Sequence, residues 1–241
     1  MSGITSRRLA WALGCGAVAL VGLSMSGCRS GSDDSGNDAL VRLINASPHA
    51  QDMAVAVDGK HVWRHSQFRS NTGYAPVGAG SYKVALEARE GGRIVSNNSF
   101  LTCDKRRAYT VLTLGRSGGG GPDVRIFGED RYAPVPQGRV RLRFVNAIAG
   151  GSGEADLLFN NIAGLPSVAY GSRSAAILLE PGTYDVKVNA SGEVSTLVGP
   201  ASLRFQAGHA YTLVAMGQSD AANPQEGVTL ESYPDDKPND E

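Results

Sequence analysis

Few residues in this chain have the types and spacing that enzyme chemistry requires. His61 and His65 lie four residues apart, the spacing of a zinc pair on a helix, but no Glu follows His61 and the segment comes just after a predicted hairpin turn. On a strand the two side chains would share a face yet lie on the order of 13 Å apart, too far to bind one ion. We interpret them as surface histidines, and the sequence predicts no metal site and no cofactor.

The other catalytic motifs are incomplete. The glycine run 118–121 lacks the Lys-Ser/Thr pair of a phosphate-binding loop and opens no helix, so it predicts a flexible hairpin connection. The Gly-x-Ser-x-Gly match at 115–119 runs into this glycine run, which opens no helix, so it is not the strand-to-helix elbow of a Ser–His–Asp hydrolase. We therefore predict no catalytic residues.

Acidic residues occur in pairs or near turns without the spacing of a known site. They are Asp33, Asp34, Asp52, Asp58, Asp123, Glu154 and Asp156. We expect the pairs 33/34 and 154/156 to be solvated charges in a tether or in loops rather than the carboxylates of a glycosidase. The other three could contact calcium in a loop, but no EF-hand-like spacing supports such a site.

The composition excludes several classes of protein. The 241 residues include 23 Lys and Arg against 23 Asp and Glu, so the net charge is zero and no nucleic-acid partner is predicted. The 3 Cys are too few for a disulfide-rich scaffold. The chain contains one long apolar run, whereas a polytopic membrane protein needs several.

That apolar run belongs to a targeting segment. Arg7 and Arg8 precede the apolar stretch 9–23, and small residues follow up to Cys28. This order predicts a secretory signal peptide over residues 1–27. The alternatives are an ordinary signal peptide with a chance Cys and a lipoprotein signal.

The residues before Cys28 resemble the lipobox of bacterial lipoproteins, with Met25 where that family usually has Leu. The resemblance implies that Cys28 carries the lipid and becomes the mature N-terminus, so the partner is a membrane reached through an N-terminal lipid anchor. Residues 28–38 then form the lipidated Cys and a flexible polar tether. Because Arg29 stands where Asp favours the inner membrane, the resemblance implies the outer membrane of the cell envelope.

The remaining sequence is an internal repeat. Segments recur at an offset of 102 residues, and the opening segment recurs at 101. The matching pairs are 41–46 with 142–147, 58–59 with 160–161, 68–70 with 170–172, 80–84 with 182–186 and 108–115 with 210–217. We predict two units, 39–132 and 139–235, joined by the Pro-containing linker 133–138. The segment from Pro234 onward is charged and Pro-broken, and we expect it to be disordered, with 236–241 as the tail beyond the second unit.

The repeated segments alternate apolar and polar residues or form short apolar runs between Gly, Asp and Asn turns. This pattern predicts short antiparallel strands and no helix. The segments Val41–Pro48, Gly80–Tyr82 and Ala108–Thr110, together with a Val-Asp-Gly hairpin and Tyr74, resemble DUF4397, a bacterial envelope domain. The resemblance implies an all-β fold of two tandem immunoglobulin-like antiparallel β-sandwiches and no family-wide active site.

Cys103 is the thiol that remains if the signal peptide is removed and Cys28 is acylated. The repeat aligns it with Phe205, and it aligns Leu101 with Leu203. Apolar residues two apart lie on one face of a strand, so we predict a buried structural Cys rather than a nucleophile.

Two functional classes remain. The first is a non-catalytic envelope lipoprotein that serves as a structural, adhesive or ligand-binding module for an envelope protein or glycan. The second is an envelope hydrolase with a loop-borne active site. The first is preferred because no motif supports the second, and the sequence predicts no oligomeric state.

Replacing Cys28 with Ser should move the protein from the membrane to the soluble fraction, because the acyl chains supply the anchoring. Metabolic labelling with a fatty-acid probe tests this directly. The probe should label the wild-type chain and not the variant, and an unlabelled wild-type chain would refute lipidation.

Overall fold

The computed structural model describes residues 38–50, 53–58, 60–88, 94–115, 122–130, 133–151 and 153–235, all within one compact unit that spans 34–241. The predicted signal peptide, Cys28, the tether up to residue 37 and the tail 236–241 lie outside the described residues. Within the described ranges no helix is long and apolar enough to cross a membrane.

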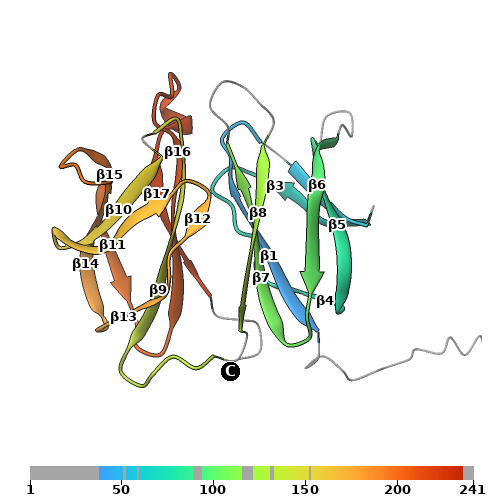
Figure 1. Cartoon of the computed structure of the whole chain (residues 1–241), viewed down its shortest axis with the longest axis horizontal. Helices are drawn as coiled ribbons and strands as arrows, with labels where there is room; N and C mark the ends of the chain where they lie inside the picture. Colours follow the sequence, from blue (N-terminus) through green and yellow to red (C-terminus); the bar gives the residue numbers. More distant parts are fainter. Residues whose placement is uncertain are drawn as a thin grey trace, which may run out of the picture. The chain divides into compact units, whose positions relative to one another are not determined.

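The first repeat forms two four-stranded sheets (Figure 1). One sheet has the order β4-β1-β7-β8, and the other has the order β3-β2-β5-β6. The bounds are β1 Ala39–Ala46, β2 Met53–Val57, β3 Lys60–Ser66, β4 Ala75–Val77, β5 Gly80–Ala88, β6 Ile94–Cys103, β7 Arg107–Leu114 and β8 Asp123–Asp130.

The second repeat forms the same two sheets. The orders are β12-β9-β16-β17, with β13 also paired to β9, and β11-β10-β14-β15. The bounds are β9 Val140–Ala149, β10 Glu154–Phe159, β11 Ile162–Ala169, β12 Ser172–Arg173, β13 Ile177–Leu179, β14 Gly182–Ala190, β15 Thr196–Phe205, β16 Ala210–Gln218 and β17 Thr229–Pro234. A short 3-10 helix at Pro224–Glu226 precedes β17. The all-β fold with two β-sandwiches is therefore confirmed.

The strand register matches the two offsets seen in the sequence. In the first sandwich Val41 lies opposite Tyr109, and in the second Leu142 lies opposite Tyr211. Both pairings are parallel, between β1 and β7 and between β9 and β16, whereas the other strand pairings are antiparallel. Alternation of residue types reports which face a side chain occupies and not the direction of the neighbouring strand, so these parallel pairs differ from the purely antiparallel expectation.

The repeated turns have a common geometry. Asp58 has a φ of 48°, and Asn160 and Asn161 have φ values of 50° and 65°, the left-handed conformation that tight hairpin turns require. The side chain of Asp58 accepts a hydrogen bond from the Lys83 amide at 2.7 Å, and that of Asn160 accepts one from the Asp185 amide at 3.0 Å. Each turn is thereby fixed to the neighbouring strand in the same way.

A buried Asn in the first strand of each repeat ties the sheet to loops. The Asn45 amide donates to the carbonyl oxygens of Ala50 and Ser66 at 2.7 and 3.0 Å. Asn146 donates to Val168 at 2.9 Å. A buried amide with its hydrogen bonds satisfied fixes loop position, so the repeated Asn-Ala motif is a structural feature of the fold.

Each sandwich encloses its own apolar core. Cys103 is 2% exposed in the first core, and Phe205 is 2% exposed at the equivalent position of the second. The two residues pair with Gly80 and Gly182, so they also share a register. The predicted burial of Cys103 is confirmed.

Replacing Cys103 with Ala should lower the free energy of unfolding by about 1–2 kcal/mol through lost packing. Burial, followed by the negative charge of Asp104, raises the pKa of this thiol from 9.0 to about 11. The unfolded thiol ionises from its ordinary pKa, so the stability that the neutral thiol contributes is lost as pH rises through this window. The difference between wild type and variant in urea unfolding should therefore shrink from pH 9 to pH 11, and a constant difference would contradict the raised pKa.

Candidate functional site

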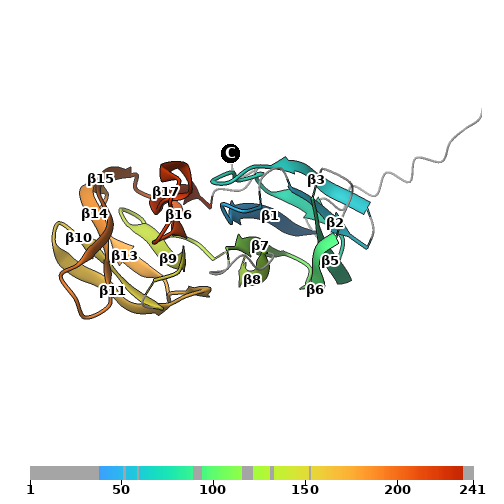
Figure 2. The ribbon, with the colours of Figure 1, turned by 90° about the horizontal axis from the view of Figure 1, so that it is seen from above.

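A group of buried polar side chains lies between the two sandwiches, where the β4-β1-β7-β8 sheet faces the β12-β9-β16-β17 sheet (Figures 1 and 2). We call these two facing surfaces the paired face. Its apolar part is a third buried cluster of Ile44, Ala46, Leu112, Leu114, Val145, Ala147, Val214, Met216 and Tyr233. Consequently β1 is buried along its whole length, with one set of side chains in its own core and the other in the paired face.

Arg42 is the centre of the polar part. Its side chain is 1% exposed, and its guanidinium lies 2.5 Å from the carboxylate of Asp235. It also donates to the Thr110 hydroxyl at 3.0 Å, to the Pro234 carbonyl oxygen at 3.0 Å and to the Thr212 hydroxyl at 3.3 Å. The Thr212 hydroxyl donates in turn to Asp235 at 2.8 Å. A buried charge is tolerated only when it is paired and hydrogen-bonded in this way.

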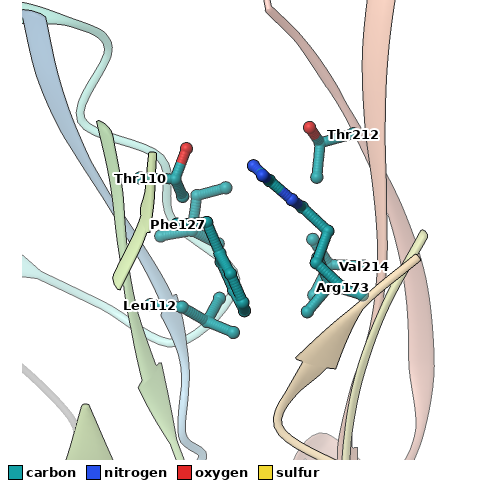
Figure 3. Close-up of a pocket in the computed structure, with 8 residues that line it drawn as sticks. Thr110, Leu112, Phe127, Arg173, Thr212 and Val214 are labelled. Carbon is teal, nitrogen blue, oxygen red and sulfur yellow. The ribbon is translucent and has the colours of Figure 1, made fainter. Parts of the chain in front are cut away.

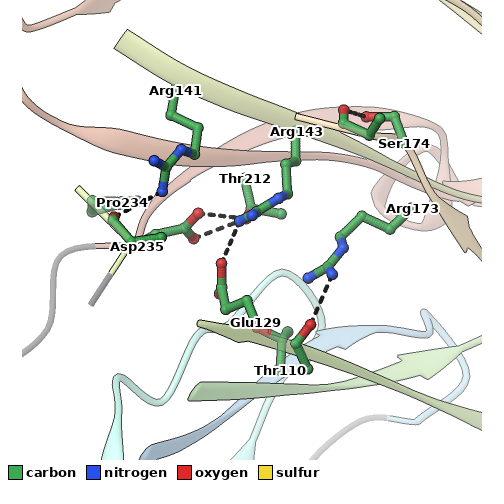
Figure 4. Close-up of polar contacts among 12 residues, drawn as sticks. Thr110, Glu129, Arg141, Arg143, Arg173, Ser174, Thr212, Pro234 and Asp235 are labelled. Atoms are coloured by element: carbon green, nitrogen blue, oxygen red, sulfur yellow. Dashed lines mark hydrogen bonds and ion pairs between the residues drawn. The ribbon is translucent and has the colours of Figure 1, made fainter. Parts of the chain in front are cut away.

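A second ion pair of the paired face lies near Asp235 (Figure 4). Arg143 of β9 pairs with Glu129 of β8, and Glu129 also accepts a hydrogen bond from the Tyr74 hydroxyl at 3.2 Å. The Tyr74 ring lies 4.7 Å from the Arg42 guanidinium. The two ion pairs are thus linked through one aromatic side chain, which lies against the cation of one pair and donates to the anion of the other.

The pKa shifts at the paired face follow from burial and from these partners. Burial alone would lower the pKa of Arg42, but attraction to Asp235 raises it above its ordinary value, so the guanidinium is charged. Burial raises the pKa of Asp235, and the charge of Arg42 opposes that increase. Burial also raises the pKa of Tyr74, which keeps its hydroxyl protonated as a donor.

A narrow pocket lies in the paired face, and Arg173 extends into it (Figure 3). Its guanidinium lies 5.1 Å from the Phe127 ring and donates to the Gly128 carbonyl oxygen at 3.0 Å. Thr110, Thr212 and four aliphatic side chains complete the lining. The empty volume is about 230 Å³, part of it open to solvent, but the space is too narrow to admit a water molecule. Through this contact Arg173 of the second sandwich is joined to β8 of the first.

The structure does not bring the sequence-predicted candidates together. Asp58 lies in the β2–β3 turn, and Asp123 pairs with Arg125 at 2.8 Å at the start of β8. Among the described residues no group of three or more His, Cys, Asp or Glu side chains could hold a metal ion. Other candidates lie outside the described part of the chain: Asp33, Asp34, Asp52, the glycine run 118–121 and the side chains of His61 and His65.

One expectation about the acids was wrong. Glu154 and Asp156 belong to β10 and do not lie in a loop. Asp156 accepts hydrogen bonds from the amides of Ser167 at 2.7 Å and Gly192 at 3.1 Å. Burial alone would raise the pKa of Asp156, but these hydrogen bonds lower it. Its carboxylate therefore fixes two turns.

The expectation of disorder from Pro234 onward was also wrong at its first two residues. Pro234 ends β17, and Asp235 is 5% exposed beside Arg42. The charged composition of this segment suggested solvent exposure, but Asp235 neutralises a buried guanidinium from the opposite sandwich. A signal for this was present in the sequence, because Arg42 and Arg143 occupy equivalent places in two mostly apolar strands.

Comparison with known protein families agrees with the repeat. The model of the family described as "Domain of unknown function (DUF4397)" matches residues 39–152 and again 148–240. A search of curated proteins finds no match.

Replacing Arg42 with Met should lower the free energy of unfolding by about 3–5 kcal/mol, because Asp235 would be left as an unpaired buried charge. Adding Asp235→Leu to this variant should recover much of the loss. Arg125→Met is the matched control, since its pair with Asp123 is half-exposed and should cost less than about 1 kcal/mol. Urea unfolding measures all four proteins, and equal costs for Arg42→Met and Arg125→Met would contradict the central role of Arg42.

Proposed function

The chain belongs to the DUF4397 family, and from this premise we propose that it is a non-catalytic, lipid-anchored module of the cell envelope that binds an envelope protein or glycan. In this proposal the lipid on Cys28 holds the chain at the outer membrane, and residues 29–38 tether the two sandwiches to it. The two sandwiches form the scaffold that presents a binding surface.

The paired face is the feature of the structure that supports a structural role. Its charged groups are engaged with one another across the two sandwiches: Arg42 with Asp235, and Arg143 with Glu129. Its apolar side chains come from both repeats. Because these residues hold the two sandwiches together, we propose that they form a scaffold and that the binding surface lies elsewhere.

The strand that best supports partner binding is β6. It lies at the edge of its sheet, next to β5 in the hydrogen-bonded order, and its ten residues include no charged residue and no Pro. Edge strands of natural proteins are commonly protected by such residues. Phe100 on this strand is 70% exposed.

The second repeat provides an internal comparison. The equivalent strand β15 is also an edge strand, but it contains Pro200 and the exposed Arg204, and Ser202 occupies the place of Phe100. At this equivalent edge the second repeat is protected, whereas the first repeat is not. An extended segment of a partner could add to β6 through backbone hydrogen bonds, with Phe100 supplying apolar contact area.

Placing a photo-crosslinking amino acid at position 100 in the full chain should capture a specific partner in native envelopes, identified by mass spectrometry. The matched control is the same amino acid at position 202, which is exposed at the equivalent place and should capture little. A Phe100→Lys substitution should reduce copurification of that partner several-fold without changing stability by more than about 0.5 kcal/mol. Equal capture from positions 100 and 202 would refute β6 as the binding surface.

A further inference from the structure

The paired face is built from equivalent positions of the two repeats. Its apolar cluster contains four pairs of residues that are related by the repeat offset of 101 or 102. These pairs are Ile44 with Val145, Ala46 with Ala147, Leu112 with Val214 and Leu114 with Met216. Each repeat thus contributes the same surface, which is the property of an isologous dimer interface.

The ion pairs cross between the repeats in a reciprocal way. Arg42 and Arg143 are equivalent residues of the first strand of each repeat. Glu129 lies opposite Ala108, and the Asp235 amide donates to the carbonyl oxygen of Ala210, the equivalent of Ala108. The two acids therefore occupy equivalent places. The Arg of each repeat pairs with the acid of the other.

A backbone contact follows the same relation. Arg42 of the first repeat donates to the Pro234 carbonyl oxygen of the second. Arg173 of the second repeat donates to the Gly128 carbonyl oxygen of the first. Gly128 and Pro234 are equivalent, because they lie opposite Tyr109 and Tyr211. The donor differs between the two contacts, but the acceptor position is the same.

We infer that the paired face is a self-complementary dimer interface held within one chain, and that the face of either repeat will bind the same face of a second copy of this chain. Each repeat carries the apolar cluster, one Arg and one acid in matching places. In a pair of first repeats Arg42 would meet Glu129. In a pair of second repeats Arg143 would meet Asp235.

The intact chain pairs its own repeats because the linker 133–138 gives them a high effective concentration for each other. Pairing between chains becomes available when the repeats are separated and allowed to exchange, as in domain swapping. This inference does not depend on the cellular location or the partner proposed above.

The test uses the full chain with a protease site inserted between Pro136 and Gln137, which are both exposed. The chain is cut in its folded state, unfolded in guanidinium chloride and refolded by dilution, and native mass spectrometry then identifies the species. Re-formation of the pair of first and second repeats shows that refolding works. We expect pairs of two first repeats and pairs of two second repeats beside it. Their masses are distinct, so the spectrum identifies each kind of pair. The original pair together with monomers alone would overturn the inference.

Charge variants distinguish pairing through the self-complementary face from non-specific association of the repeats. Glu129→Lys should reduce the amount of pairs of first repeats at least tenfold and leave the amount of pairs of second repeats unchanged. Asp235→Lys should do the opposite. Glu193→Lys, at an exposed site of the second repeat, should change neither. Equal effects of Glu129→Lys and Asp235→Lys on both pairs would overturn the inference.

If the cut repeats do not refold, the uncut chain with the inserted protease site is used to test the same inference. Refolded at increasing concentration, it should give a rising fraction of dimers in light scattering. When these folded dimers are cut at the inserted site, native mass spectrometry should find pairs of two first repeats and pairs of two second repeats. A chain that stays monomeric at every concentration would refute the inference. Dimers that release only pairs of a first and a second repeat would also refute the inference.

Discussion

A buried guanidinium must be neutralised by a negative charge next to it. For Arg42 that charge is Asp235, which lies 193 residues away along the chain. The cost of leaving such a charge unpaired is several kcal/mol. This requirement fixes the end of β17 against β1, and with it the second sandwich against the first. It also explains why Pro234 and Asp235 of a charged segment belong to the folded structure.

The central strands follow from the same constraint. Because β1, β7, β9 and β16 lie between a sandwich core and the paired face, both sides of these strands are buried. Their sequences are therefore mostly apolar, with polar exceptions where a hydrogen-bond partner is available. Among these exceptions, Asn45 and Asn146 form hydrogen bonds with loops. Arg42 and Thr110 lie on the side that faces the other sandwich, where they are hydrogen-bonded to each other.

Duplication has kept the scaffold and changed its surface. The turn at Asp58, the buried Asn45 and the place of Cys103 each have an equivalent in the second repeat that makes the same contact or fills the same place. The edge strands differ, since β6 has no charge and no Pro whereas β15 has both. Equivalent positions that stay the same report the requirements of folding. Those that differ are the places where a binding role specific to one repeat can reside.

The sequence by itself determined the repeat, the β class, the turn positions and the burial of Cys103. These features depend on local spacing, on the period of two along a strand and on residues that tolerate left-handed backbone. Only the tertiary structure decided the parallel pairing of β1 with β7, the place of Glu154 and Asp156 in a strand, and the pairing of Arg42 with Asp235. Those features depend on which surfaces meet in space, and a charge in the sequence does not reveal whether its partner is water or a residue 193 positions away.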